Sequence, residues 1–309
     1  MKNLAGKVAL LTGASGGLGI HIARALANEG VKLALVASPG MGLEELRNSI
    51  LAKKVEAISS VSDLRELDQI HAVFELVLRH FGRIDILINN AGVEFTAALH
   101  TLTEENVRDV VRINLEAPLL LTRLVLPQML ERRAGHVVNI SSLAGKSGPA
   151  FQEPYAASKA GLIAFTSSLR ATYRPQGVSA SVICPGFVEA GIYARLKTRS
   201  GCAAPALLGT SPPERVGESV VRCIRKDLPE AVINPYPVRP LFAMAALFPR
   251  LGEWLIRQTG AHDFFRKAEG ALRAKEAQAG QSLALKTDVG QNSQDEQDCG
   301  KGACHSRLD

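Results

Sequence analysis

Residues 7–19 read KVALLTGASGGLG, a short aliphatic run that passes into a glycine-rich turn. The aliphatic part is typical of a strand that is buried on both faces. After the turn, apolar side chains recur at helical spacing until Gly30, a common type of helix stop. Glycines between a strand and a helix let backbone N–H groups approach a pyrophosphate, which the helix N-terminus also attracts. The stretch therefore predicts a dinucleotide-binding turn, with an ordinary structural turn as the alternative.

Strand-like and helix-like patterns alternate along most of the chain. The strand candidates lie at 31–37, 55–60, 84–90, 136–141 and 178–186, and helical spacing covers about 41–53, 64–80, 104–131 and 154–173. This alternation predicts a doubly wound, Rossmann-like α/β fold, in which helices cover both faces of a parallel sheet. Ligands of such sheets bind beyond the carboxyl ends of the strands.

The composition changes near residue 231. We expect a dinucleotide-binding and catalytic domain at 1–230, an apolar and basic helical extension at 231–276, and a flexible tail at 277–309. The longest apolar run of the extension, Leu241–Phe248, is far shorter than the roughly 20 residues that span a bilayer. Three interpretations stay open for the extension: a helical region packed on the domain or on a neighbouring subunit, a helix in a membrane surface, or a disordered segment.

Charge and cysteine content argue against several classes of function. The formal net charge is +6, but Lys and Arg are scattered, and no basic block with interleaved aromatic residues predicts nucleic-acid binding. The five cysteines form no regular framework, which indicates a reducing cytoplasm. Cys299, Cys304 and His305 match no metal-binding spacing, so we expect no metal site. The N-terminal apolar run leads straight into glycines, so we expect no signal peptide and a cytoplasmic protein.

The pentapeptide YAASK, residues 155–159, places Tyr155 and Lys159 on one face of a helix. A neighbouring ammonium favours the phenolate, so Lys159 is expected to lower the pKa of Tyr155 and to suit it to acid–base chemistry. The alternative is that Tyr155 packs in the core while Lys159 is solvated.

Several motifs then occur in a fixed order. They are TGxxxGxG at 12–19, NNAG at 89–92, Asn114, NISS at 139–142, YxxxK at 155–159 and PG at 185–186. Over residues 1 to about 230 the chain thus resembles the short-chain dehydrogenase/reductase family. The resemblance implies hydride transfer between NAD(P)(H) and a carbonyl or secondary alcohol.

The resemblance also implies roles for four catalytic residues. Tyr155 would exchange a proton with the substrate oxygen, and Lys159 would hold the nicotinamide ribose hydroxyls. Ser142 has the family's spacing to Tyr155 and would hydrogen-bond the substrate oxygen, which leaves Ser141 as a neighbour. Asn114 would hold a water that links Lys159 to solvent, or, as the alternative, would satisfy backbone groups at a helix bend.

The cofactor contacts follow from the same resemblance. They are Gly13, Ser15, Gly17, Leu18, Gly19, Ser38, Asn90, Ala91, Gly92, Tyr155, Lys159, Pro185, Gly186 and Val188. Ala37 stands where NAD-preferring members usually carry an acid, and Ser38 where NADP-preferring members often carry arginine. We therefore expect NADP(H) to be favoured over NAD(H). Ser60 replaces an aspartate that touches adenine, with Asp63 three residues later, and Ala190 replaces a threonine aimed at the carboxamide. These changes suggest a modest cofactor affinity.

The substrate pocket is expected to form from the loop at 187–213 and from C-terminal residues. This loop mixes apolar with basic side chains, which favours a medium or large apolar carbonyl or alcohol, such as a lipid, steroid or acyl compound. A nucleotide-binding regulatory or scaffold protein is the alternative function. The resemblance further implies a homo-oligomer formed through the helices at 104–131 and 154–173. Peripheral membrane contact through 238–267 stays open.

Overall fold

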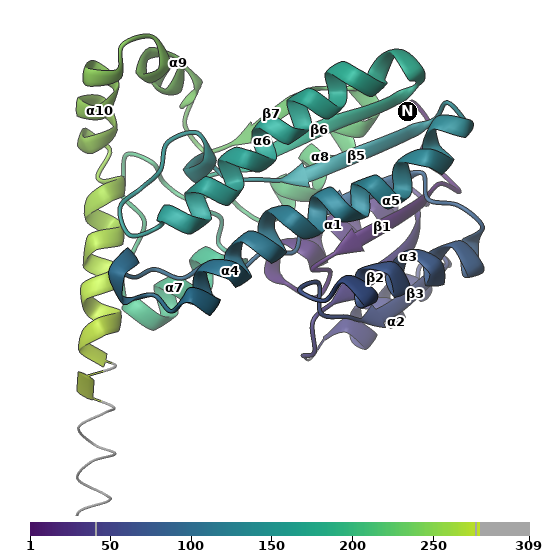
Figure 1. The fold of residues 1–309 in the computed structure, drawn as a ribbon, viewed down its shortest axis with the longest axis horizontal. Coiled ribbons are helices and arrows are strands. Elements are labelled where there is room, and N and C mark those ends of the chain that lie inside the picture. Colours follow the sequence, from purple (N-terminus) through teal and green to yellow (C-terminus); the bar gives the residue numbers. More distant parts are fainter. Residues whose placement is uncertain (41, 276, 279–309) are drawn as a thin grey trace, which may run out of the picture.

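The computed structural model describes residues 1–40, 42–275 and 277–278. Seven parallel strands form one sheet in the order β3-β2-β1-β4-β5-β6-β7 (Figure 1). The strands are β1 (Val8–Thr12), β2 (Lys32–Ala37), β3 (Ala57–Val61), β4 (Ile86–Asn89), β5 (Gly135–Ile140), β6 (Val178–Pro185) and β7 (Glu230–Ile233). The chain order reverses between β1 and β4, so the predicted doubly wound architecture is confirmed.

Helices cover both faces of the sheet. On one face lie α1 (Gly17–Asn28), α2 (Leu43–Leu51) and α8 (Glu214–Lys226), and on the other α3 (Leu67–Phe81), α5 (Ala117–Glu131) and α6 (Glu153–Tyr173). β1 shows why this strand is aliphatic throughout, because Ala9 and Leu11 enter the first core whereas Val8 and Leu10 enter the second. The short helices η1 (Leu99–Thr101), η3 (Leu143–Gly145) and η4 (Arg174–Gln176) connect the larger elements.

The helix that we expected over 104–131 is not uniform. It begins as α4 (Glu104–Val111), passes through a π-helical turn, η2 (Arg112–Glu116), and continues as α5. Thr103 caps its N-terminus, where its side chain accepts a hydrogen bond from the backbone N–H of Asn106. The π turn contains Asn114, and π turns inside α-helices are frequent at functional sites.

Some elements were absent from the sequence expectation. The loop expected at 187–213 contains α7 (Gly191–Ser200), and the pattern of α8 was not recognised. The edge strand β7 was also missed, and it pairs in parallel with β6 from Val182↔Glu230 to Pro185↔Ile233. A domain boundary at residue 230 would divide this strand.

The C-terminal region is helical, as expected. It consists of α9 (Arg239–Leu247), α10 (Pro249–Gln258) and a further helix over 261–275, which residues 277–278 continue. Figure 1 shows this last helix running past α7, and Phe264, Ala268 and Leu272 pack there against Tyr193 and Leu196. In the described residues no helix has both the length and the apolarity needed to cross a bilayer. Residues 279–309 lie outside the described part, and with them most of the expected tail and Cys299, Cys304 and His305.

Candidate active site

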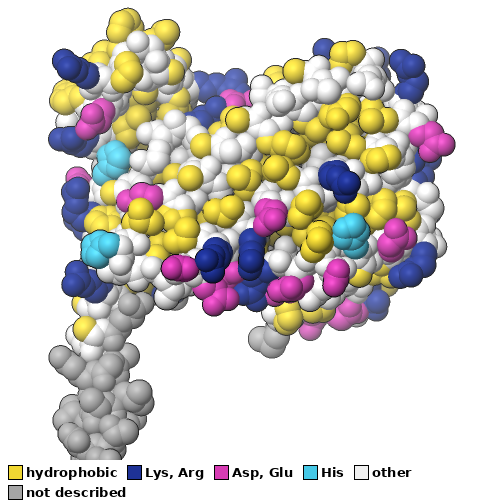
Figure 2. Space-filling view, viewed as in Figure 1, with side chains coloured by type: hydrophobic (Ala, Val, Ile, Leu, Met, Phe, Trp, Pro, Cys, Tyr) yellow, Lys and Arg dark blue, Asp and Glu magenta, His cyan; other side chains and the backbone are white. Residues whose placement is uncertain are grey.

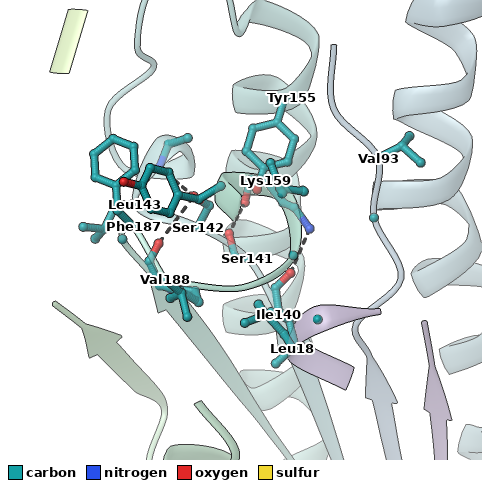
Figure 3. Close-up of a pocket in the computed structure, with 18 of the residues that line it drawn as sticks. Leu18, Val93, Ile140, Ser141, Ser142, Leu143, Tyr155, Lys159, Phe187 and Val188 are labelled. Atoms are coloured by element: carbon teal, nitrogen blue, oxygen red, sulfur yellow. Dashed lines mark hydrogen bonds between the residues drawn. The ribbon is translucent and has the colours of Figure 1, made fainter. Parts of the chain in front are cut away.

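A cavity of about 510 Å³ opens at the carboxyl edge of the sheet. Its lining comes from segments that follow all seven strands, for example Gly13 after β1, Ser38 after β2, Ser62 after β3, Asn90 after β4, Ser142 after β5, Gly186 after β6 and Asn234 after β7. Figure 3 shows part of this lining, with side chains from several of these segments directed toward the same space. The cavity therefore lies where a doubly wound sheet binds its ligands.

The N-terminus of α1 borders the cavity without a capping side chain. Its N-cap is Gly16, no side chain accepts a hydrogen bond there, and the first turn carries no acidic residue. The free N–H groups of such a turn bind anions well. Gly13 has φ +63°, and a Cβ on it would lie 2.8 Å from the Cα of Ala91, while a Cβ on Gly17 would overlap the backbone of Gly191. These residues fit the pyrophosphate of a dinucleotide.

Gly19 is the exception among the predicted glycines, because it does not line the cavity. A Cβ on it would overlap the carbonyl oxygen of Gly13 and lie 2.7 Å from that of Ala14. The geometry assigns Gly19 to the close packing of α1 against the turn.

The NNAG segment is hydrogen-bonded to the glycine turn. The Oγ1 of Thr12 accepts from the backbone N–H groups of Asn90 (3.0 Å) and Ala91 (3.1 Å). The side-chain amide of Asn90 donates to the carbonyl oxygens of Thr12 (3.1 Å) and Gly13 (2.9 Å). The glycine turn and the NNAG segment therefore hold each other in position.

Tyr155 and Ser142 both line the cavity. Burial raises the pKa of Tyr155 to about 12, although a hydrogen bond with Ser142 lowers it and the charge of Glu94 raises it further. The Oγ of Ser142 accepts from the backbone N–H of Ala144 at 3.1 Å. Ser142 thus has both a fixed position and a contact with the tyrosine.

The expectation that Lys159 lowers the pKa of Tyr155 is wrong for this structure. The Nζ of Lys159 lies 5.6 Å from the centroid of the tyrosine ring and donates to the carbonyl oxygen of Ile140 at 2.9 Å. Desolvation of the phenolate therefore dominates. Lys159 is only 3% exposed, which contradicts the alternative of a solvated lysine, and burial lowers its own pKa to about 8.

Asn114 is completely buried behind the cavity and does not line it. Its Oδ1 accepts from the N–H of Val93 at 2.9 Å, and its Nδ2 donates to the carbonyl oxygen of Val93 (2.9 Å) and to Ser158 (3.2 Å). These bonds match the helix-bend alternative. Asn114 and Lys159 nevertheless converge, because a Cβ on Gly92 would lie 3.3 Å from Oδ1 and 3.5 Å from Nζ.

The two serines of the NISS motif have different surroundings. Ser141 is 3% exposed, and its hydroxyl donates to the carbonyl oxygen of Lys159 at 2.8 Å, which ties α6 to the end of β5. Ser142 is less buried, and its hydroxyl donates a long hydrogen bond of 3.5 Å to the carbonyl oxygen of Pro185. The hydroxyl of Ser141 is therefore enclosed within the fold, whereas Ser142, which also contacts Ala144 and Tyr155, lines the cavity, where a ligand can reach it.

At the opposite end of the cavity the expectation for Ser60 needs correction. Ser60 does not line the cavity. Its hydroxyl forms a hydrogen bond of 3.0 Å with that of Ser62. Ser62 and Asp63 reach the cavity instead, one turn of chain later. Hydrogen bonds from Arg65 hold the pKa of Asp63 below its usual value. Ser38 is exposed at the end of β2 and lines the same region.

The rest of the cavity wall is mostly apolar. It is formed by Phe187, Tyr193, Leu196, Leu208, Leu241, Phe242, Ile256 and Phe265. Phe187 meets Tyr193 edge to face at a centroid distance of 5.2 Å and stacks near Phe265 at 6.1 Å. The contributions of the 187–213 segment and of C-terminal residues were both expected, although the sequence did not indicate which residues of α9 and α10 would line the wall.

A polar group beside Tyr155 was also missed. Gln152 is 1% exposed, lines the cavity, and donates from Nε2 to Glu94 (2.8 Å) and to Thr96 (2.6 Å), while Thr96 donates to Glu94. These residues lie more than fifty positions apart in the chain, so no local pattern links Gln152 to Glu94. They place a carboxylate close enough to raise the pKa of Tyr155.

Fourteen predicted residues line the cavity: Gly13, Ser15, Gly17, Leu18, Ser38, Asn90, Ala91, Gly92, Ser142, Tyr155, Lys159, Pro185, Gly186 and Val188. Ala190, the position of the expected threonine, lines it as well. Within the part of the chain that the structure describes, no three His, Cys, Asp or Glu side chains come together as metal ligands do.

The model of the short chain dehydrogenase family matches residues 7–200. A ketoacyl reductase of Nostoc sp., HetN, is 38% identical over 272 residues, which cover 86% of this chain and 94% of the relative. A match of that length cannot be held within residues 1–230, so the similarity extends into the C-terminal extension.

Two solved structures share the fold. A metagenomic short-chain oxidoreductase in complex with NADP has a TM-score of 0.64 and 34% identity, and the match covers 76% of this chain and 99% of that one. A variant of actinorhodin polyketide ketoreductase with NADPH has a TM-score of 0.69 and 31% identity, over 74% of this chain and 95% of that one. The chain thus belongs to the short chain dehydrogenase family and is an NAD(P)-dependent oxidoreductase.

Proposed function

We propose that the protein reduces a medium or large apolar ketone, or oxidises the corresponding secondary alcohol, with Tyr155 as the acid or base. One observation carries this proposal. A single cavity joins the glycine turn at the N-terminus of α1 to Ser142, Tyr155 and an extended apolar wall. Such a cavity can hold a dinucleotide at one end and an apolar substrate at the other.

The bound nicotinamide cofactor supplies or accepts the hydride. In reduction the hydroxyl of Tyr155 donates its proton to the substrate oxygen, and in oxidation the phenolate accepts it. Burial raises the pKa of Tyr155, so the hydroxyl carries the proton at neutral pH that reduction requires. Ser142 hydrogen-bonds the same oxygen and stabilises the negative charge that develops on it.

Lys159 and Asn114 act on the cofactor side of this chemistry. Because Lys159 is buried beside Gly92, its ammonium donors can hold the ribose hydroxyls of the nucleotide. Asn114 has a buried side chain that converges on the same point, which supports a role in linking Lys159 to water. The remaining predicted cofactor residues bind through the glycine turn, the NNAG segment and the backbone near Pro185.

We propose a preference for NADP(H) over NAD(H). The end of β2 offers no carboxylate that would repel a 2′-phosphate, and Ser38 offers a hydroxyl donor beside the cavity. Both solved relatives described above contain NADP or NADPH. Ser38→Asp should weaken NADPH binding by charge repulsion and leave NADH binding similar, whereas Ser38→Ala tests loss of the hydroxyl alone. Equal NADPH and NADH dissociation constants in the wild-type protein would contradict the preference.

The apolar wall of the cavity supports the proposed substrate class. Phe187, Tyr193, Leu241 and Phe242 offer a long apolar surface and few hydrogen-bonding groups. The similarity to a ketoacyl reductase favours acyl-type ketones within this class. Steroids and other lipids stay within the proposal, and activity confined to small polar sugars would contradict it.

We also propose that the protein forms a homo-oligomer and that residues 238–267 make peripheral contact with a membrane. Val111 and Leu119 are exposed along α4 and α5, which supports contact between copies there. A monomeric mass in analytical ultracentrifugation at micromolar concentration would overturn the oligomer.

The test of the reaction is cofactor oxidation by the purified protein with a panel of apolar ketones, followed at the nicotinamide absorbance. Turnover that depends on chain length supports the proposal. Tight NADPH binding without turnover of any ketone or alcohol in the panel would favour the regulatory or scaffold alternative.

A further inference from the structure

Five large apolar side chains at the tip of the C-terminal region are not covered by the part of the chain that the structure describes. They are Met244 and Leu247 of α9, Phe248 between the helices, and Leu251 and Trp254 of α10, and we name them the hairpin patch. Each is at least 39% exposed, and Leu247 reaches 73%. Figure 2 shows apolar side chains gathered over α9 and α10 at the upper left, with Lys and Arg at the margin.

The opposite faces of the same two helices line the cavity. Leu241 and Phe242 of α9 and Ile256 of α10 belong to its wall. The helices pack closely at Gly252, where an added Cβ would lie 2.5 Å from the Cβ of Ala245. The hairpin is therefore a thin partition, apolar toward the cavity and apolar toward the exterior.

We propose that the hairpin patch docks on a lipid bilayer that contains anionic lipids. Between residues 239 and 267 the chain carries five Lys or Arg side chains and two acidic ones. Arg250 stands between Phe248 and Leu251 in the chain, whereas Arg257 pairs with Glu253 and Arg239 with Glu230. Basic side chains around exposed Trp, Phe and Leu are typical of segments that bind anionic membrane surfaces.

The charge pattern disfavours a second copy of the chain as the occupant. In a two-fold interface the same patch meets itself, so both sides would carry Arg250 and the net positive charge of residues 239–267. A bilayer supplies the opposite charge at its surface and apolar volume beneath it. The binding is peripheral in this proposal, because neither α9 nor α10 reaches the length of a bilayer span.

The docked arrangement gives the cavity a route from the membrane. An apolar ketone dissolved in the outer part of the bilayer would meet the exterior face of the hairpin and enter the cavity beside α9 and α10. The route rests on the proposed reaction, and the docking specifies the membrane contact that is proposed above for residues 238–267.

The experiment uses the one tryptophan of the chain, Trp254, which is 57% exposed. Full-length protein is titrated with vesicles of phosphatidylcholine that contain about one third phosphatidylglycerol. We expect a blue shift of the tryptophan emission, quenching by brominated lipids, and weaker binding at high salt. Leu247→Glu should weaken partitioning by roughly tenfold or more, because it puts a charge into the patch. Leu207→Glu, at a position that is 68% exposed outside the hairpin, is the matched control and should bind like the wild type.

Two results would overturn the docking proposal. One is an unchanged tryptophan emission with vesicles, and the other is a blue shift that grows with protein concentration without vesicles, which would identify a second copy as the occupant. These measurements need neither cofactor nor substrate, so they stand apart from the proposed reaction. The route is tested by turnover: Leu247→Glu should slow reduction of a vesicle-borne long-chain ketone and leave that of a water-soluble ketone unchanged. Equal slowing of both ketones would overturn the route.

Discussion

Replacing Phe264 with alanine should release the C-terminal helix from the catalytic part of the protein. Phe264 is 4% exposed, and its ring centroid lies 4.9 Å from those of Phe187 and Phe265. Removal of a buried phenylalanine from a core costs about 3–5 kcal/mol. The lost contacts join the 261–275 helix to α7 and to the cavity wall, and none of them lies in the sheet. We therefore expect the loss to fall on the docking of this helix.

The assay is amide hydrogen exchange of 261–275 together with steady-state kinetics. Exchange in this helix should accelerate by at least about a hundredfold, while amides of the central strands change little. Because Phe187 and Phe265 line the cavity, KM for an apolar ketone should rise, and the NADPH dissociation constant should stay unchanged. Leu247→Ala, at an exposed position, is the control and should change stability by no more than about 0.5 kcal/mol. Unchanged exchange in 261–275 after Phe264→Ala would show that Phe264 does not hold this helix against α7 and the cavity wall.

Three further outcomes follow from particular contacts. Gly19→Ala should destabilise the fold by about 1–3 kcal/mol and weaken cofactor binding, because its Cβ would overlap the carbonyl oxygen of Gly13. Thermal unfolding and NADPH titration measure the two effects. Gly270→Ala makes the same change on a helix where a Cβ meets nothing within 4 Å, so it should instead stabilise the 261–275 helix by about 0.5–1 kcal/mol. Glu94→Gln removes a negative charge that raises the pKa of Tyr155, so the phenolate forms at lower pH. Alcohol oxidation should then reach a given rate at lower pH than in the wild type, and an unshifted pH–rate profile would contradict that role of Glu94.

The sheet and the assembly of the motifs could be predicted from sequence because both depend on local pattern. Strands such as β1 are continuous aliphatic runs, and parallel strands bring their carboxyl ends to one edge. The segments after β1, β4, β5 and β6 therefore had to meet at the cavity once the strand order was doubly wound. The choice of Ser142 over Ser141 as the partner of Tyr155 then followed from the family resemblance, because Ser142 has the family's spacing to Tyr155.

Features that depend on tertiary surroundings could not be predicted. The π turn at Asn114 is stabilised by backbone groups of Val93, which a helical pattern does not reveal. The four-residue strand β7 is short and follows a proline, so its pattern was too weak to recognise. The pKa of Tyr155 was expected to fall with a lysine nearby, but the burial that raises it is invisible in a pentapeptide.

The proposed reaction requires that Tyr155 transfers the proton in a nicotinamide-dependent reduction. The decisive measurement is NADPH oxidation with an apolar ketone for the wild-type protein and for Tyr155→Phe, with the NADPH dissociation constant of each. The substitution should lower turnover by about 10²–10⁴-fold and leave NADPH binding nearly unchanged. Equal turnover by the two proteins would contradict it.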